Sequence, residues 1–256
     1  MRPESVPARD DQASLAAPDP LEGDARLPAH FGDAWPAVQR FHAMLRDEGV
    51  LRGLVGPREV DRLWERHLVN SAAVVPFLPS TGTIVDVGSG AGLPGVVIAA
   101  MRPDAQVVLL EPMERRTVWL TEVADTIGLS NVTVLRGRAE DQVGLLEADA
   151  VTARAVAALD KLYGWTLPLL RVGGRLVALK GGRARDEADA ATAAGALLGG
   201  GVAEILVAPT LPGLEPTSVV VVEKTGPGTA APAARVSRGT EGRSRGSRRS
   251  TKGHRP

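Results

Sequence analysis

A glycine-rich segment that directly follows a run of β-branched residues most constrains how this chain can fold. Residues 83–87 predict a short buried strand, and residues 86–95 read D-V-G-S-G-A-G-L-P-G. Glycines at alternate positions let a backbone turn tightly and approach a ligand, because they carry no Cβ. The apolar stretch 96–101 predicts a helix, whose first N–H groups are free beside the same turn. A strand, a glycine loop and a helix in this order are typical of nucleotide sites in doubly wound α/β sheets.

The rest of the central region alternates predicted strands with predicted helices. Fully apolar strands separated by helices favour a parallel sheet that is covered on both faces. Only the Pro- and Gly-containing segment 209–216 separates the last two strands, which predicts an antiparallel hairpin that closes the sheet. A helix is expected at 115–127, and further strands are expected at 106–110, 131–135, 150–153, 175–179, 202–207 and 219–223.

The region before the glycine loop is expected to be helical. Asp33 is a plausible N-cap and Pro36 suits a first turn, in a helix that Gly49 ends. A second helix is expected from Pro57, because apolar residues and His67 recur at helical spacing between 60 and 68. The predicted fold class is therefore α/β, with a Rossmann-like sheet and an N-terminal helical cap.

Composition excludes several kinds of site. The chain of 256 residues has no cysteine, which rules out disulfide scaffolds, cysteine-ligated metal centres and a cysteine nucleophile. No metal site is predicted. No apolar run approaches the roughly 18 residues of a membrane span, and the N-terminus lacks the apolar core of a secretory signal. A cytoplasmic protein without a membrane partner is expected.

Two kinds of ligand compete for the glycine loop. Gly90, Gly92 and Gly95 form a literal GxGxxG, and Glu111 follows about 20 residues on, as in dinucleotide-binding dehydrogenases. The same loop also reads D-x-G-x-G-x-G from Asp86, the first motif of S-adenosylmethionine (SAM) methyltransferases. In that interpretation Asp86 can hold the ammonium of the ligand and Glu111 its ribose hydroxyls. A pyrophosphate beside Asp86 would be repelled, which favours SAM.

Several motifs together resemble one family. In their order and spacing the chain is similar to the RsmG/GidB family of 16S ribosomal RNA methyltransferases, and 52–68 resembles its actinobacterial branch. The resemblance covers roughly residues 35–224. The motifs that carry it are DVGSGAGLPG (86–95), RHLVNS (66–71), RGRAED (136–141), TARAVA (152–157) and ALKGG (178–182).

The resemblance implies a class I SAM-dependent methyltransferase that modifies N7 of a guanine in a decoding-region loop of 16S rRNA. Its SAM contacts fall on Gly88, Leu93, Ala139, Glu140 and Arg154. The residues alone also indicate the four positions Asp86, Gly90, Gly92 and Glu111. The expected partner is 16S rRNA, in the 30S subunit or its precursor, and the chain is expected to act as a monomer.

The expected chemistry requires no catalytic acid or base. N7 of guanine carries an in-plane lone pair and no proton, so attack on the methyl group needs only in-line positioning. No catalytic residue is therefore predicted. His67 is interpreted either as a core histidine or as a residue near the RNA. Basic residues near strand ends are candidate phosphate contacts: Arg115, Arg116, Arg136, Arg138, Arg154 and Lys180. The alternatives to this enzyme are a NAD-dependent dehydrogenase and a non-catalytic RNA- or ribosome-binding module.

Four segments are expected. They are a disordered Pro/Ala-rich tail at 1–29, the helical cap at 30–80, the SAM-binding domain at 81–224 and a disordered basic tail at 225–256. The basic tail has eight basic residues and one acid, a net charge of +7, and the remainder of the chain has −7. Such a separation of charge suggests that the tail meets a polyanion.

Deleting residues 226–256 should leave SAM affinity and the melting temperature nearly unchanged, because neither the predicted pocket nor the predicted core uses them. RNA affinity should fall, and the slope of log K against log salt should flatten by up to about 0.7 per lost phosphate contact. Filter-binding titrations at several salt concentrations measure this slope. An identical slope with and without the tail would show that its arginines do not contact RNA.

Overall fold

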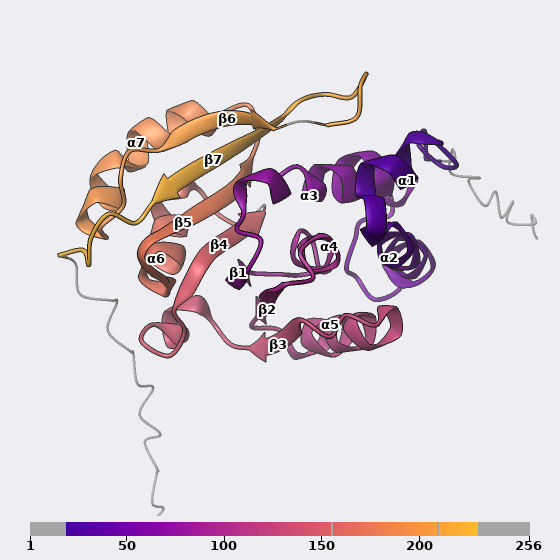
Figure 1. Ribbon diagram of the computed structural model, residues 1–256, viewed down its shortest axis with the longest axis horizontal. Helices are drawn as coiled ribbons and strands as arrows, with labels where there is room; N and C mark the ends of the chain where they lie inside the picture. Colours follow the sequence, from indigo (N-terminus) through magenta and orange to yellow (C-terminus); the bar gives the residue numbers. More distant parts are fainter. Residues whose placement is uncertain (1–18, 155, 209, 230–256) are drawn as a thin grey trace, which may run out of the picture.

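Seven strands form one mixed sheet at the centre of the molecule (Figure 1). The computed structural model describes residues 19–154, 156–208 and 210–229. The strand order is β3-β2-β1-β4-β5-β7-β6. The strands are β1 (Gly82–Val87), β2 (Ala105–Glu111), β3 (Val132–Arg136), β4 (Ala148–Arg154), β5 (Leu170–Lys180), β6 (Glu204–Ala208) and β7 (Thr217–Glu223).

The direction of the strands separates this sheet from a dinucleotide-binding one. Strands β1 to β5 pair in parallel, whereas β7 runs antiparallel between β5 and β6. The dinucleotide-binding fold has an all-parallel sheet of order 3-2-1-4-5-6. The predicted terminal hairpin is confirmed, and its second strand, not its first, pairs with β5. The predicted α/β fold class, with a Rossmann-like sheet and an N-terminal helical cap, is therefore confirmed.

Alternating side chains on the strands give the sheet two apolar faces, because successive residues of a strand point to opposite sides. Ile84, Val107 and Leu109 face the layer that contains α4 (Gly95–Met101) and α5 (Glu114–Ile127). Their neighbours Val85 and Val108 face α6 (Leu159–Thr166) and α7 (Ala184–Leu197). The predicted two-sided burial of the sheet is therefore confirmed.

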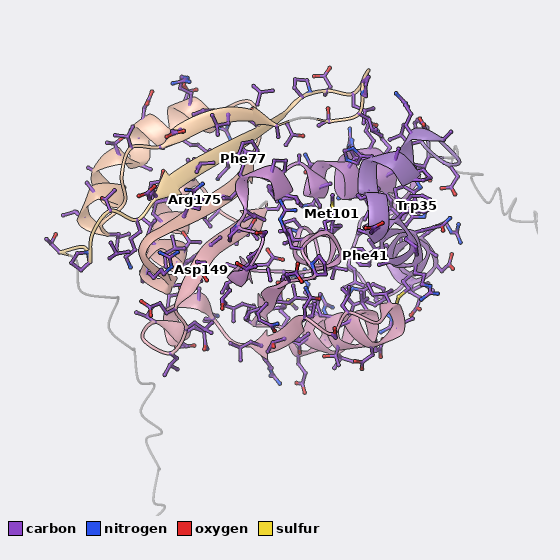
Figure 2. The ribbon with its side chains drawn as sticks, viewed as in Figure 1. Trp35, Phe41, Phe77, Met101, Asp149 and Arg175 are labelled. Carbon is purple, nitrogen blue, oxygen red and sulfur yellow. The ribbon has the colours of Figure 1, made fainter. Side chains whose placement is uncertain are left out.

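The N-terminal helices share the first of these two cores with α4 and α5. Phe41 lies on α2 where this helix packs against α4 and α5 (Figure 2), and its side chain is fully buried. These helices are thus a layer of the same folded unit as the sheet, and we call them the N-terminal layer. Their elements are α1 (Arg26–Phe31), η1 (Gly32–Ala34), α2 (Trp35–Glu48), η2 (Val60–Arg62), η3 (Leu63–Val69), α3 (Asn70–Ala72) and η4 (Val75–Phe77).

The structure corrects several expected boundaries. Folded structure extends into the expected 1–29 tail, because Leu21 and Leu27 are buried in the core and α1 begins at Arg26. Asp33 lies in the turn η1 and does not cap α2 with its side chain. The helix expected from Pro57 begins later, as the turn η2, and continues as the wider π-helical η3.

The C-terminal end of the folded region also differs from the expected boundary at residue 224. Residues 225–229 belong to the described structure, and the amide of Thr229 donates a hydrogen bond to the Leu197 carbonyl at the end of α7. A truncation that removes only 230–256 therefore spares this contact. Residues 1–18 and 230–256, which make up most of the two expected tails, lie outside the described residues. No helix in the described part of the chain is long and apolar enough to cross a membrane.

Candidate functional site

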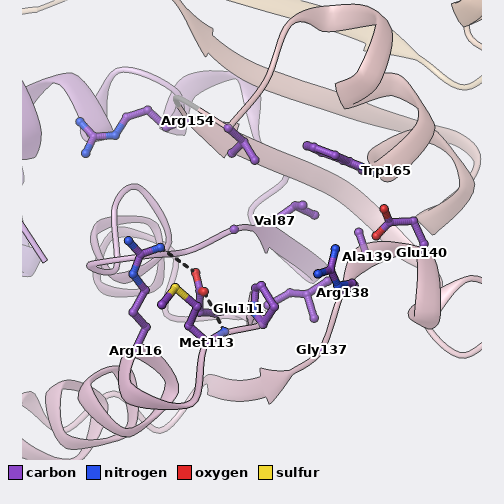
Figure 3. A pocket seen from close by; sticks show the side chains of 14 residues that line it. Val87, Glu111, Met113, Arg116, Gly137, Arg138, Ala139, Glu140, Arg154 and Trp165 are labelled. Atoms are coloured by element: carbon purple, nitrogen blue, oxygen red, sulfur yellow. Dashed lines mark hydrogen bonds and ion pairs between the residues drawn. The ribbon is translucent and has the colours of Figure 1, made fainter. Parts of the chain in front are cut away.

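A cavity of about 350 Å³ lies at the carboxyl ends of β1, β2 and β4 (Figure 3). Five of the nine residues expected at the site line it: Gly88, Glu111, Ala139, Glu140 and Arg154. Its other walls come from Val87, Leu110, Pro112, Met113, Arg116, Gly137, Arg138, Val156 and Trp165. The remaining expected residues, Asp86, Gly90, Gly92 and Leu93, do not line this cavity.

Glu111, the last residue of β2, supplies a buried carboxylate at the cavity wall. Its Oε2 accepts a hydrogen bond from the amide of Gly90 at 2.9 Å, and its Oε1 accepts one from the amide of Met113 at 3.0 Å. The guanidinium of Arg116 on α5 lies 3.7 Å from Oε2. In Figure 3, Glu111 and Arg116 lie on the opposite side of the cavity from Trp165. Each carboxylate oxygen keeps a second acceptor site, which is the chemistry that a ribose diol needs.

The glycines of the loop have different tasks. Gly88 has a φ of +73° and its amide donates to the Leu110 carbonyl, which joins the loop to β2. Gly90 has a φ of +56°, and a Cβ there would meet no atom closer than 3.7 Å. Gly92 has a φ of +103°, and a Cβ there would approach Val96 to 2.7 Å. Gly92 is thus required both by packing against α4 and by its backbone conformation, whereas Gly90 is required by its backbone conformation alone.

Asp86 lies beneath the loop and not at the cavity wall. Its Oδ2 accepts a hydrogen bond from the amide of Gly95, the first residue of α4. Burial raises the pKa of Asp86 to about 7, and its Oδ1 has no hydrogen-bond partner among the described residues. A direct contact of Asp86 with a ligand ammonium stays a prediction. A carboxylate on this helix terminus disfavours a pyrophosphate there, because two anions would share one amide.

Leu93, Ala139 and Glu140 are expected from the resemblance alone. Leu93 is 5% exposed and packs in the core shared by the sheet and the N-terminal helices. Its role toward SAM stays a prediction. Ala139 and Glu140 begin the short helix η5 (Ala139–Gln142) after β3, and both line the cavity. The backbone of η5 therefore brings RGRAED next to the glycine loop, although the two lie about fifty residues apart in the sequence.

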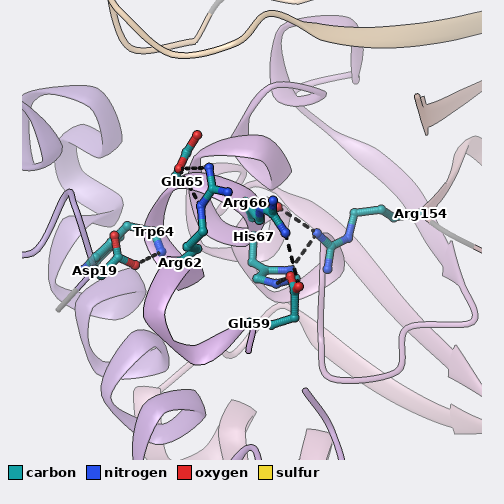
Figure 4. A network of polar contacts seen from close by, with 8 residues as sticks. All are labelled: Asp19, Glu59, Arg62, Trp64, Glu65, Arg66, His67 and Arg154. Atoms are coloured by element: carbon teal, nitrogen blue, oxygen red, sulfur yellow. Dashed lines mark hydrogen bonds and ion pairs between the residues drawn. The ribbon is translucent and has the colours of Figure 1, made fainter. Parts of the chain in front are cut away.

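Arg154 ends β4 and is held by the N-terminal layer. Its Nη1 donates a hydrogen bond to the carbonyl of Arg66 at 3.3 Å and contacts Nδ1 of His67 at 3.0 Å. The Nε2 atom of His67 lies 3.0 Å from Oε2 of Glu59 (Figure 4). Burial and the Arg154 charge lower the pKa of His67 to about 4, so His67 is neutral near pH 7.

Nine of the fourteen residues that line the cavity are not among the expected site residues. One of them is Arg116, which is expected only as a phosphate contact and which the structure also pairs with Glu111. Met113 and Trp165 were not singled out. No signal in the sequence identifies Trp165, because only the packing of α6 against η5 and the sheet brings it to the cavity.

The cavity suits a ligand with an adenosyl group and an amino-acid end. Val87, Leu110, Ala139 and Trp165 give it apolar walls that can enclose a purine. The buried carboxylate of Glu111 suits ribose hydroxyls, and the guanidinium of Arg154 suits a carboxylate. The residues present therefore fit SAM.

Comparison with known proteins gives a consistent result. A family model described as rRNA small subunit methyltransferase G matches residues 35–209. Proteins named ribosomal RNA small subunit methyltransferase G are similar to this chain. The one from Thermobifida fusca is 58% identical over 161 residues, 63% of this chain and 68% of the relative. The one from Bifidobacterium longum is 47% identical over 218 residues, 80% of this chain and 99% of the relative.

Replacing Glu111 by glutamine should weaken SAM binding by about 10- to 100-fold. Hydrogen bonds to a charged acceptor contribute about 1.5–3 kcal/mol, and glutamine removes both the charge and one acceptor oxygen. Isothermal titration calorimetry with SAM measures the change. Glu114→Gln is a matched control, because Glu114 is exposed on α5 and does not line the cavity. Unchanged affinity in folded Glu111→Gln would remove Glu111 from the ligand site.

The two loop glycines should respond differently to valine. Gly90→Val should abolish SAM binding while the denaturation midpoint falls little, because a Cβ has space but positive φ disfavours a β-branched residue and shifts the loop. Gly92→Val should lower the denaturation midpoint strongly, because its side chain would collide with Val96 and Phe41. Calorimetry and urea denaturation of both variants test this difference. Normal SAM binding by Gly90→Val would show that the loop conformation is not needed for the ligand.

Proposed function

Because the chain belongs to the family of rRNA small subunit methyltransferase G, we propose that it methylates N7 of a guanine in a decoding-region loop of 16S rRNA. Its activity as a SAM-dependent methyltransferase of small-subunit rRNA follows from membership of the family. The base, the atom and the loop are the proposal. The dehydrogenase alternative is set aside by family membership, and the antiparallel β7 and the Asp86 carboxylate at the start of α4 agree with this.

One observation carries the proposal furthest: a second cavity is lined by Arg66, which contacts Arg154 of the first cavity. This groove has a volume of about 480 Å³. Its lining includes the cations Arg62, Arg66 and Lys180, together with Asn70 and the two carboxylates of Glu65 and Glu215. The carbonyl of Arg66 accepts a hydrogen bond from Arg154, which itself lines the SAM cavity. We call this second cavity the η3–β5 groove. Its position supports the entry of a nucleotide from this side.

The cations of the η3–β5 groove are suited to phosphate, although each is paired in the structure. Arg62 pairs with Glu65, Arg66 with Glu59, and Lys180 with Glu187. Guanidinium and ammonium groups have several N–H donors, so a phosphate can share them with these carboxylates. N7 lies in the deep, narrow major groove of an RNA duplex, so the target base must come from a loop or be turned outward.

The reaction at N7 needs positioning and exclusion of water. SAM supplies a methyl group on a positively charged sulfur when it is bound. Glu111 is suited to hold the ribose and Arg154 the carboxylate, while the apolar walls keep water from the reacting atoms. N7 has no proton to remove, so none of the chain's carboxylates is required as a base. This is consistent with the assignment of no catalytic acid or base.

Transfer of tritiated methyl from SAM to small-subunit rRNA tests the proposal. Methylation at N7 makes the guanine open to borohydride reduction, which weakens the glycosidic bond between the base and its ribose. Aniline then cleaves the RNA at that position, so the cleavage site maps the modified guanine. A transcript with 7-deazaguanine at the mapped position should accept no methyl, because that base has carbon in place of N7. Labelled rRNA that borohydride and aniline do not cleave would contradict the N7 assignment.

The same assay separates the remaining alternatives. Parallel reactions with naked 16S rRNA, a precursor particle and the 30S subunit identify the preferred partner. SAM binding without transfer to any of the three substrates would favour the non-catalytic RNA-binding module. Sedimentation of the active protein tests the expectation that it acts as a monomer.

A further inference from the structure

Three side chains from different elements form a continuous polar chain beside the SAM cavity (Figure 4). Glu59 precedes η2, His67 lies on η3, and Arg154 ends β4. Oε2 of Glu59 lies 3.0 Å from Nε2 of His67, and Nδ1 of His67 lies 3.0 Å from Nη1 of Arg154. The His67 side chain is 14% exposed, whereas that of Glu59 is 35% exposed. The cavity lining includes Arg154 but neither Glu59 nor His67.

The chemistry of arginine sets the direction of every hydrogen bond in this chain. A guanidinium can only donate, so Nδ1 of His67 must accept from Arg154 and carries no proton. The single ring proton of neutral His67 is then on Nε2, which donates to the carboxylate of Glu59. The imidazole thereby lies between a cation and an anion and keeps them apart.

Arg154 keeps donors for a ligand in this arrangement. Within the described part of the chain, its hydrogen bonds to His67 and to the Arg66 carbonyl both use Nη1. Its Nε and Nη2 have no hydrogen-bond partner among those residues and are not among the fully buried unpaired atoms. Two neighbouring N–H donors of a guanidinium match the two oxygens of a carboxylate.

We propose that Glu59 and His67 are a positioning pair, which holds the Arg154 guanidinium at the cavity so that Nε and Nη2 bind the carboxylate of SAM. Neither member of the pair contacts the ligand. This inference rests on the proposed function, because it takes SAM as the ligand of the cavity. It assigns to the RHLVNS motif a task in cofactor binding, through a residue of the N-terminal layer.

The pair is needed because Arg154 has two carboxylates of the protein close to it. Both Asp86 and Glu59 attract its charge. The imidazole lies between the Arg154 guanidinium and the Glu59 carboxylate, so this cation and this anion do not pair directly. A neutral ring that accepts at Nδ1 prevents this pairing and gives the guanidinium one preferred direction. The charged groups that act on His67 are Glu59, Arg66 and Arg154.

Two conservative substitutions of His67 separate its two hydrogen bonds. The amide oxygen of asparagine can take the place of Nδ1, so His67→Asn keeps an acceptor for Arg154. The longer glutamine places its amide near Nε2, so His67→Gln keeps a contact with Glu59 and loses the acceptor for Arg154. We expect His67→Gln to raise the Kd for SAM about tenfold and His67→Asn to leave it within about twofold.

Decarboxylated SAM distinguishes positioning of Arg154 from a general loss of structure. This probe lacks the carboxylate, so His67→Gln should not change its Kd, measured by the same calorimetry. In an Arg154→Ala background, His67→Gln should have no further effect on SAM, because the two residues act through one contact. Equal losses for SAM and for decarboxylated SAM, or additive losses in the double variant, would overturn the proposal.

Nitrogen-15 NMR of the imidazole gives a readout that needs neither ligand nor activity. Near pH 7, His67 should show a neutral ring with the proton on Nε2, and Arg154→Ala should increase the other tautomer. A proton on Nδ1 in the unsubstituted protein would overturn the proposal. If His67→Gln does not fold, Glu59→Ala removes the partner of Nε2 at a half-exposed site and should weaken SAM about threefold.

These outcomes are distinguishable from those of the methyl-transfer assay. If the His67 variants behave as expected and the unsubstituted protein transfers no methyl to rRNA, the positioning pair stands and the proposed function fails. If rRNA is methylated at N7 and His67→Gln binds SAM as the unsubstituted protein does, the proposed function stands and the positioning pair fails.

Discussion

The glycine loop depends on two buried carboxyl side chains that accept hydrogen bonds from its amides. Asp86 accepts from the amide of Gly95 at the start of α4, and Glu111 accepts from the amide of Gly90 in the middle of the loop. Both side chains are almost fully buried at the ends of adjacent strands. A Cβ at Gly95 would lie 2.6 Å from Oδ2 of Asp86, so only glycine admits this contact. The shape of the SAM cavity follows from this arrangement.

The N-terminal layer completes the site that the sheet begins. Phe41 closes the space beside Gly92, and Trp119 of α5 donates from its indole nitrogen to the Ala91 carbonyl of the loop. On the other side of the loop, η3 supplies the Arg66 carbonyl and His67 to Arg154. The helical cap and the SAM-binding domain therefore form one unit, and removal of the cap would leave both the loop and Arg154 without their neighbours.

Charge is distributed around the site in pairs. The cations of the η3–β5 groove each face a carboxylate, and Arg116 faces Glu111 at the SAM cavity. The pairs Arg62–Glu65 and Arg66–Glu59 are partly exposed. Exposed pairs contribute little to folding stability, so these two can exchange partners at small cost. A polyanion and a zwitterionic cofactor can thus be bound by side chains that are already ordered by their neighbours in the protein.

The sequence by itself determined the local parts of this protein. The β-branched runs, the alternating apolar faces and the glycine spacing gave every strand and the ligand loop, because these signals act over a few neighbouring residues. The family motifs identified five residues of which four line the cavity: Gly88, Ala139, Glu140 and Arg154. Glu111 was found from its position at a strand end alone.

Only the tertiary structure decided how these parts serve one another. It placed Asp86 under the loop and Trp165 at the cavity. It also packed Gly92 closely against α4. It placed His67 between Glu59 and Arg154. Finally, it showed that Leu21 and Leu27 are buried in the core, where the pattern predicted a tail. Each of these features depends on residues far apart in the sequence, and their contacts are set by the packing of layers, which no local pattern of residues encodes.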